Sequence, residues 1–110
     1  MDYSIEYYSD AVEEEILALP DTLAARYIVL TRRMTAVGAN LGPPYTDAFG
    51  EGLFELRLKG ADGIARVFFC TLIGRRIMML HAFIKKSQKT SPRELEVARK
   101  RMKEVKDANS

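Results

Sequence analysis

Apolar and polar residues alternate at the start of the chain, and the pattern changes to a helical period soon afterwards. Residues 3–8 alternate in the manner of a short β-strand. Ser9 or Asp10 is suited to cap a first helix, which Pro20 ends. A second helix is expected over residues 21–37, because its apolar residues recur at intervals of three and four before Gly38. So short a break between the two predicts a helical hairpin.

The second half of the chain has the pattern of a β-meander followed by one more helix. Glycine and proline mark residues 39–52 as a loop, and strand-like runs follow at residues 53–58, 64–73 and 76–84. A last helix with a narrow apolar stripe is expected from Pro92. The order β-α-α-β-β-β-α predicts an α+β fold in which a small antiparallel sheet takes the hairpin on one face. The other face could remain open beside the C-terminal helix.

Charge is segregated along the chain, although the formal net charge is only +2. Residues 1–56 carry ten acids and three bases, whereas residues 57–110 carry fourteen bases and five acids. Clustered positive charge steers polyanions to a surface, and the phosphate backbone of a nucleic acid is the commonest polyanion. The alternative is a set of solvated lysines and arginines that only keep the protein in solution. The imbalance favours a nucleic-acid ligand.

Composition excludes several classes of protein. A chain of 110 residues with 47% hydrophobic residues suits one domain over residues 1–110. No segment looks like a signal peptide, and no apolar run approaches the roughly 20 residues of a membrane span. The single Cys70, expected to be buried, and the single His81 supply neither a disulfide framework nor a zinc site. We therefore expect a cytoplasmic protein with no membrane partner, metal or cofactor.

Basic residues of the three predicted strands are expected to meet near one edge of the sheet. Arg57 points away from the apolar residues of its own strand, and Arg66 follows the turn of the same hairpin. Lys85, Lys86 and Lys89 come directly after the last strand. Since strand ends and strand starts lie side by side in a meander, these residues predict a cationic concavity. Such a concavity could clamp a phosphodiester and stabilise its transition state.

The alternative for each arginine is an ion pair with Glu55, Asp62 or an acid of the helical hairpin. The basic half of the chain has too few acids to pair all its bases, so we expect the group as a whole to stay available. Two arrangements would overturn the nuclease hypothesis: Arg57 and Arg66 on opposite sides of the molecule, or both locked in carboxylate pairs.

Other polar and aromatic residues are expected to be structural. Strand alternation places His81 on the face of Ile77, Met79 and Phe83, which predicts a buried, hydrogen-bonded imidazole. Three aromatic residues could stack nucleic-acid bases if they are exposed, but anchoring of a loop or the core is the preferred interpretation. They are Tyr45, Phe49 and Phe54.

Four stretches of the chain resemble one known family: residues 52–57, 65–69, 81–90 and 94–101. They are similar to the phage-derived Gp49-like group of HigB toxins within the RelE/ParE superfamily. The block His-x-Phe-x-Lys-Lys-x-x-Lys-Thr at residues 81–90 is quite specific. The similarity covers nearly the whole chain, and the order of the predicted elements matches as well.

The resemblance implies a RelE-like fold and a type II toxin held by a helix-turn-helix antitoxin in a hetero-oligomer. RelE-like members cleave mRNA on the ribosome without a metal. The 2′-hydroxyl of the RNA attacks the adjacent phosphate and leaves a 2′,3′-cyclic phosphate. By position in the motif, the expected catalytic residues are Arg57, Arg66, Lys85 and Lys86. The expected RNA-binding residues are Lys59, Lys89, Arg93, Arg99 and Lys100.

Several alternatives stay open. The proton acceptor could be a lysine, Glu55 or a group of the ribosome. The protein could instead be a ParE-like toxin that inhibits a protein such as gyrase, or a nucleic-acid-binding module without catalysis. The antitoxin could approach the cationic surface or displace the last helix, unless that helix simply covers the core. The acidic helical hairpin is expected to face away from RNA.

Overall fold

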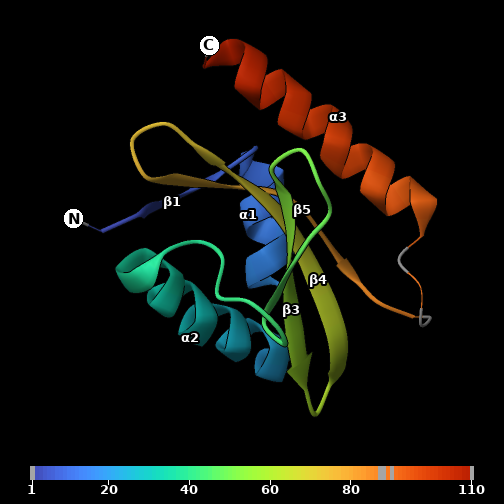
Figure 1. The fold of residues 1–110 in the computed structure, drawn as a ribbon. Helices are drawn as coiled ribbons and strands as arrows, with labels where there is room; N and C mark the ends of the chain where they lie inside the picture. The colour runs from blue at the N-terminus through green and yellow to red at the C-terminus, as the bar shows by residue number, and fades with distance from the viewer. Residues whose placement is uncertain (1, 87–88, 90, 110) are drawn as a thin grey trace.

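The computed structural model describes residues 2–86, 89 and 91–109 (Figure 1). Its elements are β1 (Ser4–Tyr7), α1 (Asp10–Leu17), α2 (Asp21–Val37), β2 (Thr46–Ala48), β3 (Leu53–Gly60), β4 (Gly63–Leu72), β5 (Arg76–Ile84) and α3 (Pro92–Ala108). The predicted α+β class and element order are confirmed, with β2 as one additional short strand. Within the described ranges, no helix is both long and apolar enough to cross a membrane.

The five strands form one mixed sheet in the order β1-β5-β4-β3-β2. β3, β4 and β5 pair antiparallel as predicted, and β2 is antiparallel to β3. β1, however, runs parallel to β5, so the expectation of a wholly antiparallel sheet is wrong at this edge. Parallel pairing needs a long connection between the two strands, and everything from α1 to β4 lies between β1 and β5.

Helices cover both faces of the sheet. α1 and α2 pack on one face, where the core cluster includes Leu23 and Val67. α3 packs on the other face, over a second cluster that includes Cys70 and Met102 (Figure 1). The sequence suggested that this second face of the sheet could remain open, but α3 partly covers it. The interpretation that α3 packs over the core is confirmed. Cys70 is fully buried, as expected.

Local sequence signals set the ends of the helices. The Ser9 hydroxyl accepts a hydrogen bond from the backbone N–H of Val12 (3.2 Å) and caps α1. α2 ends at Gly38, whose φ of 118° is favourable only for glycine. Ser91 caps α3 with its side chain, and Pro92 occupies the first turn. These residues place the start of α3 directly after the basic segment that follows β5.

A β-bulge in β5 changes which side chains share a face. Phe68 pairs with His81, but the next residue of β4 pairs with Met79, so Leu80 is the extra residue. His81 therefore lies on the α3 face of the sheet. Strict alternation had predicted that it would share the face of Met79. Its side chain is 14% exposed, and its Nε2 lies 3.0 Å from Glu94 Oε1 in α3. The predicted hydrogen bond is thus confirmed, but the side chain is half-buried and, of its predicted neighbours, it contacts Phe83, with ring centroids 5.8 Å apart.

Candidate functional site

The strand registers place the predicted basic residues in two neighbouring rows of the sheet. Arg57 of β3 lies directly opposite Arg66 of β4, and we refer to these two as the arginine pair. In the next row towards the β3–β4 turn, Lys59 lies opposite Ile64. The backbone N–H of Lys85 donates to the Ile64 carbonyl (2.8 Å), which brings the end of β5 to the same place. The predicted convergence of these strands is confirmed, and it falls on the α3 face of the sheet.

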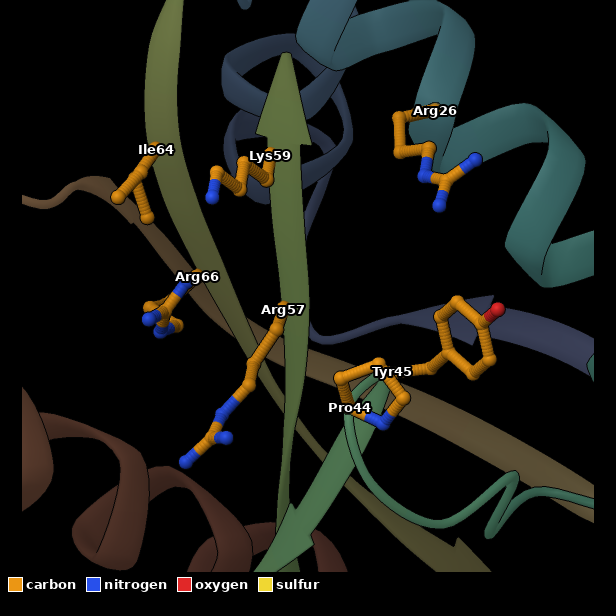
Figure 2. Close-up of a pocket in the computed structure, with 7 residues that line it drawn as sticks. All are labelled: Arg26, Pro44, Tyr45, Arg57, Lys59, Ile64 and Arg66. Carbon is orange, nitrogen blue, oxygen red and sulfur yellow. The ribbon is translucent and has the colours of Figure 1, made fainter.

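A hollow of about 200 Å³ opens at this end of the sheet (Figure 2). Its walls come from β3, β4, the residues just before β2, and α2. Four of its seven lining side chains are cationic, and none is acidic. The lining residues are Arg26, Pro44, Tyr45, Arg57, Lys59, Ile64 and Arg66.

One buried carboxylate contacts both members of the arginine pair. Glu55 is only 2% exposed, and its Oε1 lies 3.4 Å from Arg57 Nε and 3.3 Å from Arg66 Nε. Arg57 donates a hydrogen bond to this oxygen, whereas Arg66 Nε lies within ion-pair distance but outside hydrogen-bond geometry. β3 carries both Glu55 and Arg57, and Arg66 of β4 lies directly opposite Arg57. Glu55 therefore holds the two guanidinium groups side by side.

The arginine pair is otherwise unequal. Arg57 Nη2 also donates to Asp47 Oδ2 (3.0 Å), and these two side chains are 37% and 47% exposed. Arg66 is 11% exposed, and its Nη1 donates a long hydrogen bond to the Ala65 carbonyl (3.3 Å). Burial lowers the pKa of Arg66, which Glu55 partly offsets and Arg57 reinforces. The guanidinium still stays charged at neutral pH.

Each arginine has an acidic partner, which is the alternative that the sequence left open. Glu55 is one of the acids considered there and lies on β3 with Arg57, whereas Asp47 is brought to Arg57 by the pairing of β2 with β3. Asp62, another candidate, instead accepts hydrogen bonds from the N–H (3.1 Å) and hydroxyl (2.8 Å) of Thr22. Both arginines contact a carboxylate, but the contact of Arg66 Nε with Glu55 lies outside hydrogen-bond geometry, so the condition that both are locked in carboxylate pairs is met only in part. The arginine pair contacts two carboxylates in all, the buried Glu55 and the half-exposed Asp47.

The other two cations of the hollow are less constrained. Arg26 reaches the hollow from α2, and its guanidinium carbon lies 5.8 Å from the centroid of the Tyr45 ring. The guanidinium of Arg33 lies 4.9 Å from the same centroid. Among residues 2–86, 89 and 91–109, no carboxylate lies within ion-pair distance of Arg26 or of the exposed Lys59. α2 thus contributes to the hollow, so the helical hairpin does not face wholly away from it.

The three aromatic residues separate into two kinds. Phe49 packs edge-on against Phe68, with ring centroids 5.4 Å apart, and Phe54 stacks on Phe69 at 5.5 Å. These two are core anchors, as the preferred interpretation held. Tyr45 packs partly on the core but also lines the hollow, so its ring is available on a surface that carries cations.

The remaining predicted residues lie outside the lining of the hollow. Lys86 and Lys89 are exposed after β5, and the neighbouring motif positions 87, 88 and 90 fall outside the described residues. Arg93 and Lys100 line a different, shallow surface of α3. Arg99 donates to a backbone carbonyl of the loop after β2 (2.7 Å). The predicted group of basic residues is therefore not brought together as a whole.

Two residues of the site had no signal in the sequence pattern, whereas Tyr45 was considered there as a base-stacking residue. Arg26 is one polar residue among several on α2. Asp47 belongs to the three-residue β2, which is too short for alternation to reveal. Among the described residues, no three His, Cys, Asp or Glu side chains lie close enough together to hold a metal ion.

The fold and the site together define a small α+β protein that presents a cationic hollow at one end of its sheet. Residues 14–103 match the family described as Phage derived protein Gp49-like (DUF891), which is related to toxin–antitoxin systems. The chain belongs to this family. The match runs from α1 into α3 and includes every residue that lines the hollow. No curated protein matches the chain.

Proposed function

We propose that this protein is the toxin of a type II toxin–antitoxin pair and that it cleaves mRNA on the ribosome. Membership of the Gp49-like family supports the toxin. The observation that carries the nuclease is the arginine pair, held side by side at the rim of a hollow with Lys59 in the adjacent row. The HigB and RelE assignment is part of this proposal, as is a helix-turn-helix antitoxin partner.

The proposed reaction requires only groups of the RNA and the protein. The 2′-hydroxyl oxygen forms a bond to the adjacent phosphorus, and the bond from phosphorus to the 5′-oxygen of the next nucleotide breaks. The products are a 2′,3′-cyclic phosphate and a 5′-hydroxyl, so one proton leaves the nucleophile and one reaches the leaving group. Charge builds on the phosphoryl oxygens in the transition state, where Arg57 and Arg66 would donate charge-assisted hydrogen bonds.

Substrate entry requires Arg57 to exchange one partner. Its contact with Asp47 joins two half-exposed side chains, and such pairs contribute about 0–1 kcal/mol. A phosphodiester oxygen could replace Asp47 at little cost, while the buried contact with Glu55 is kept. The arginine pair would therefore meet the phosphate in a geometry that is already fixed.

The position of Glu55 bears on the proton acceptor. Its carboxylate is 2% exposed and is engaged by both arginines, so it is poorly placed to reach a 2′-hydroxyl in the hollow. We therefore assign Glu55 a positioning role. A lysine or a ribosomal group is left as the acceptor.

Induced expression without antitoxin tests the proposal. Wild-type protein should arrest translation, and primer extension should show mRNA cuts at positions set by the reading frame. Arg66→Ala should relieve the arrest, whereas Lys103→Ala, at an exposed position of α3 that pairs with Asp107, should not. Co-expression of a neighbouring helix-turn-helix protein should restore growth. Arrest without cuts would favour a protein target such as gyrase, and growth without arrest would contradict the toxin itself.

A further inference from the structure

The cations that line the hollow fall into two groups: those that contact a carboxylate and those that do not. In the first group, the arginine pair contacts Glu55. In the second group, Arg26 and Lys59 have no carboxylate within ion-pair distance among the residues that the structure describes. Uncompensated cations gain most from a phosphate group, because binding there breaks no existing ion pair. The second group therefore marks the part of the hollow best prepared for an anion.

An aromatic ring is fixed next to one of these cations, Arg26. The Tyr45 carbonyl accepts a hydrogen bond from the backbone N–H of Arg57 (2.8 Å), which ties the tyrosine to β3 at the level of the arginine pair. Figure 2 shows Tyr45 and Arg26 to one side of β3, with the Lys59 side chain directed to the other side of that strand. The ring of Tyr45 has the guanidinium groups of Arg26 and Arg33 within 5.8 Å and 4.9 Å of its centroid.

We propose that Arg26, Tyr45 and Lys59 form a subsite for the nucleotide next to the cleaved bond. Arg26 binds its phosphate, Lys59 lines the same hollow from β3, and the exposed part of the Tyr45 ring stacks on its base. This inference rests on the proposed function, since it places single-stranded RNA in the hollow. Stacking on an aromatic ring tolerates any base, so the subsite contributes affinity and alignment and does not select a sequence.

Binding of an uncleavable RNA to the full-length protein tests the subsite. The probe is a fluorescein-labelled, single-stranded 2′-O-methyl oligoribonucleotide, in which the attacking hydroxyl is blocked. Fluorescence anisotropy is measured over a range of salt concentrations. Arg26→Gln should reduce the slope of log K against log salt by about 0.7, the value for one phosphate contact on a single strand. At about 0.1 M salt this corresponds to roughly fivefold weaker binding.

The matched control is Arg32→Gln. Arg32 lies on the same helix, is exposed and does not line the hollow, so its substitution makes the same change in net charge. It should change binding less than about twofold. Tyr45→Leu should weaken binding, while Tyr45→Phe should retain it because the ring is kept. Thermal unfolding of each variant identifies any that fail to fold. If Tyr45→Leu is unfolded, the comparison of Arg26→Gln with Arg32→Gln alone tests the subsite.

The outcomes separate the subsite from the nuclease. Equal binding by Arg26→Gln and Arg32→Gln overturns the subsite, even if wild-type protein cleaves mRNA. Weaker binding by Arg26→Gln in a protein that never cleaves supports the subsite and refutes the nuclease. A wild-type protein that does not bind the probe overturns the subsite as well.

Discussion

The buried carboxylate of Glu55 allows a direct test of how the arginine pair is held. Glu55→Gln keeps the size of the side chain and one acceptor oxygen, but it removes the negative charge between Arg57 and Arg66. In the wild type, the two guanidinium nitrogens lie 3.4 Å and 3.3 Å from one oxygen. The substitution leaves two adjacent cations without the anion that they share.

The cost in stability follows from the exposure of each partner. Removing one member of a fully buried ion pair costs about 3–5 kcal/mol. Arg57 is 37% exposed and keeps Asp47, and glutamine still accepts a hydrogen bond, so the full cost does not apply. Arg66, at 11% exposure, bears most of the loss. We expect the free energy of unfolding to fall by about 1–3 kcal/mol. The Tm should then fall by about 4–12 °C.

The same substitution should separate catalysis from binding. Glu55→Gln adds one positive charge next to the hollow, so binding of an uncleavable oligoribonucleotide should be unchanged or tighter. The arginine pair loses its fixed geometry, so kcat for mRNA cleavage in a cell-free translation assay should fall by about 10–100-fold. Glu55→Asp keeps the charge on a shorter side chain and should give an intermediate rate.

Two results would refute this reasoning. If Glu55→Gln has the Tm and the cleavage rate of the wild type, the carboxylate does not hold the arginine pair. If cleavage becomes faster as binding tightens, Glu55 acts only by reducing the positive charge of the hollow. A loss of stability with an unchanged kcat would assign Glu55 a purely structural role.

Three further predictions concern the framework around the site. Glu6 accepts two hydrogen bonds from Arg76 (2.6 and 2.8 Å), and these lower the pKa of the Glu6 carboxyl from its usual 4.5. The contribution of this contact to folding stability is therefore present near neutral pH and is lost as the pH falls below 4.5. Urea unfolding should therefore show wild type and Glu6→Gln converging in stability by about pH 3, and a constant difference would contradict this. Burial raises the pKa of the Cys70 thiol, which reduces the fraction of the reactive thiolate. A thiol reagent at about pH 8 should therefore label the native protein at least about tenfold more slowly than the urea-unfolded chain. A Cβ at Gly60 would lie 2.7 Å from Thr22 Oγ1, so Gly60→Ala should cost about 1–3 kcal/mol in a thermal or urea unfolding experiment.

The elements with long, regular hydrophobic patterns could be predicted from the sequence. α2 and the meander of β3, β4 and β5 lie within two residues of their expected bounds. β2 could not be predicted, because three residues show no period and its strand forms only through pairing with β3. The parallel position of β1 could not be predicted either, since no local pattern determines which edge of a sheet a terminal strand joins.

The site follows the same division between local and distant information. Arg57 and Arg66 could be predicted to meet, because the tight turn pairs Gly60 with Gly63 and fixes the register of the whole hairpin. The place of His81 could not, because a bulge reverses alternation without a mark in the residue types. Arg26 joins the hollow from α2, and only the packing of that helix on the sheet determines this.

Segregation of charge along the sequence does not carry over into space. Asp47 lies directly opposite Glu55 across β2 and β3, an arrangement that is unfavourable for two acids alone. Arg57 contacts both carboxylates, so it also stabilises the strand pair that builds one wall of the site. Arg57→Ala would thus combine lost stability with lost activity. Lys59 has no carboxylate within ion-pair distance in the described part of the chain, so removing its charge breaks no ion pair. Lys59→Gln should therefore lower activity while leaving the Tm unchanged.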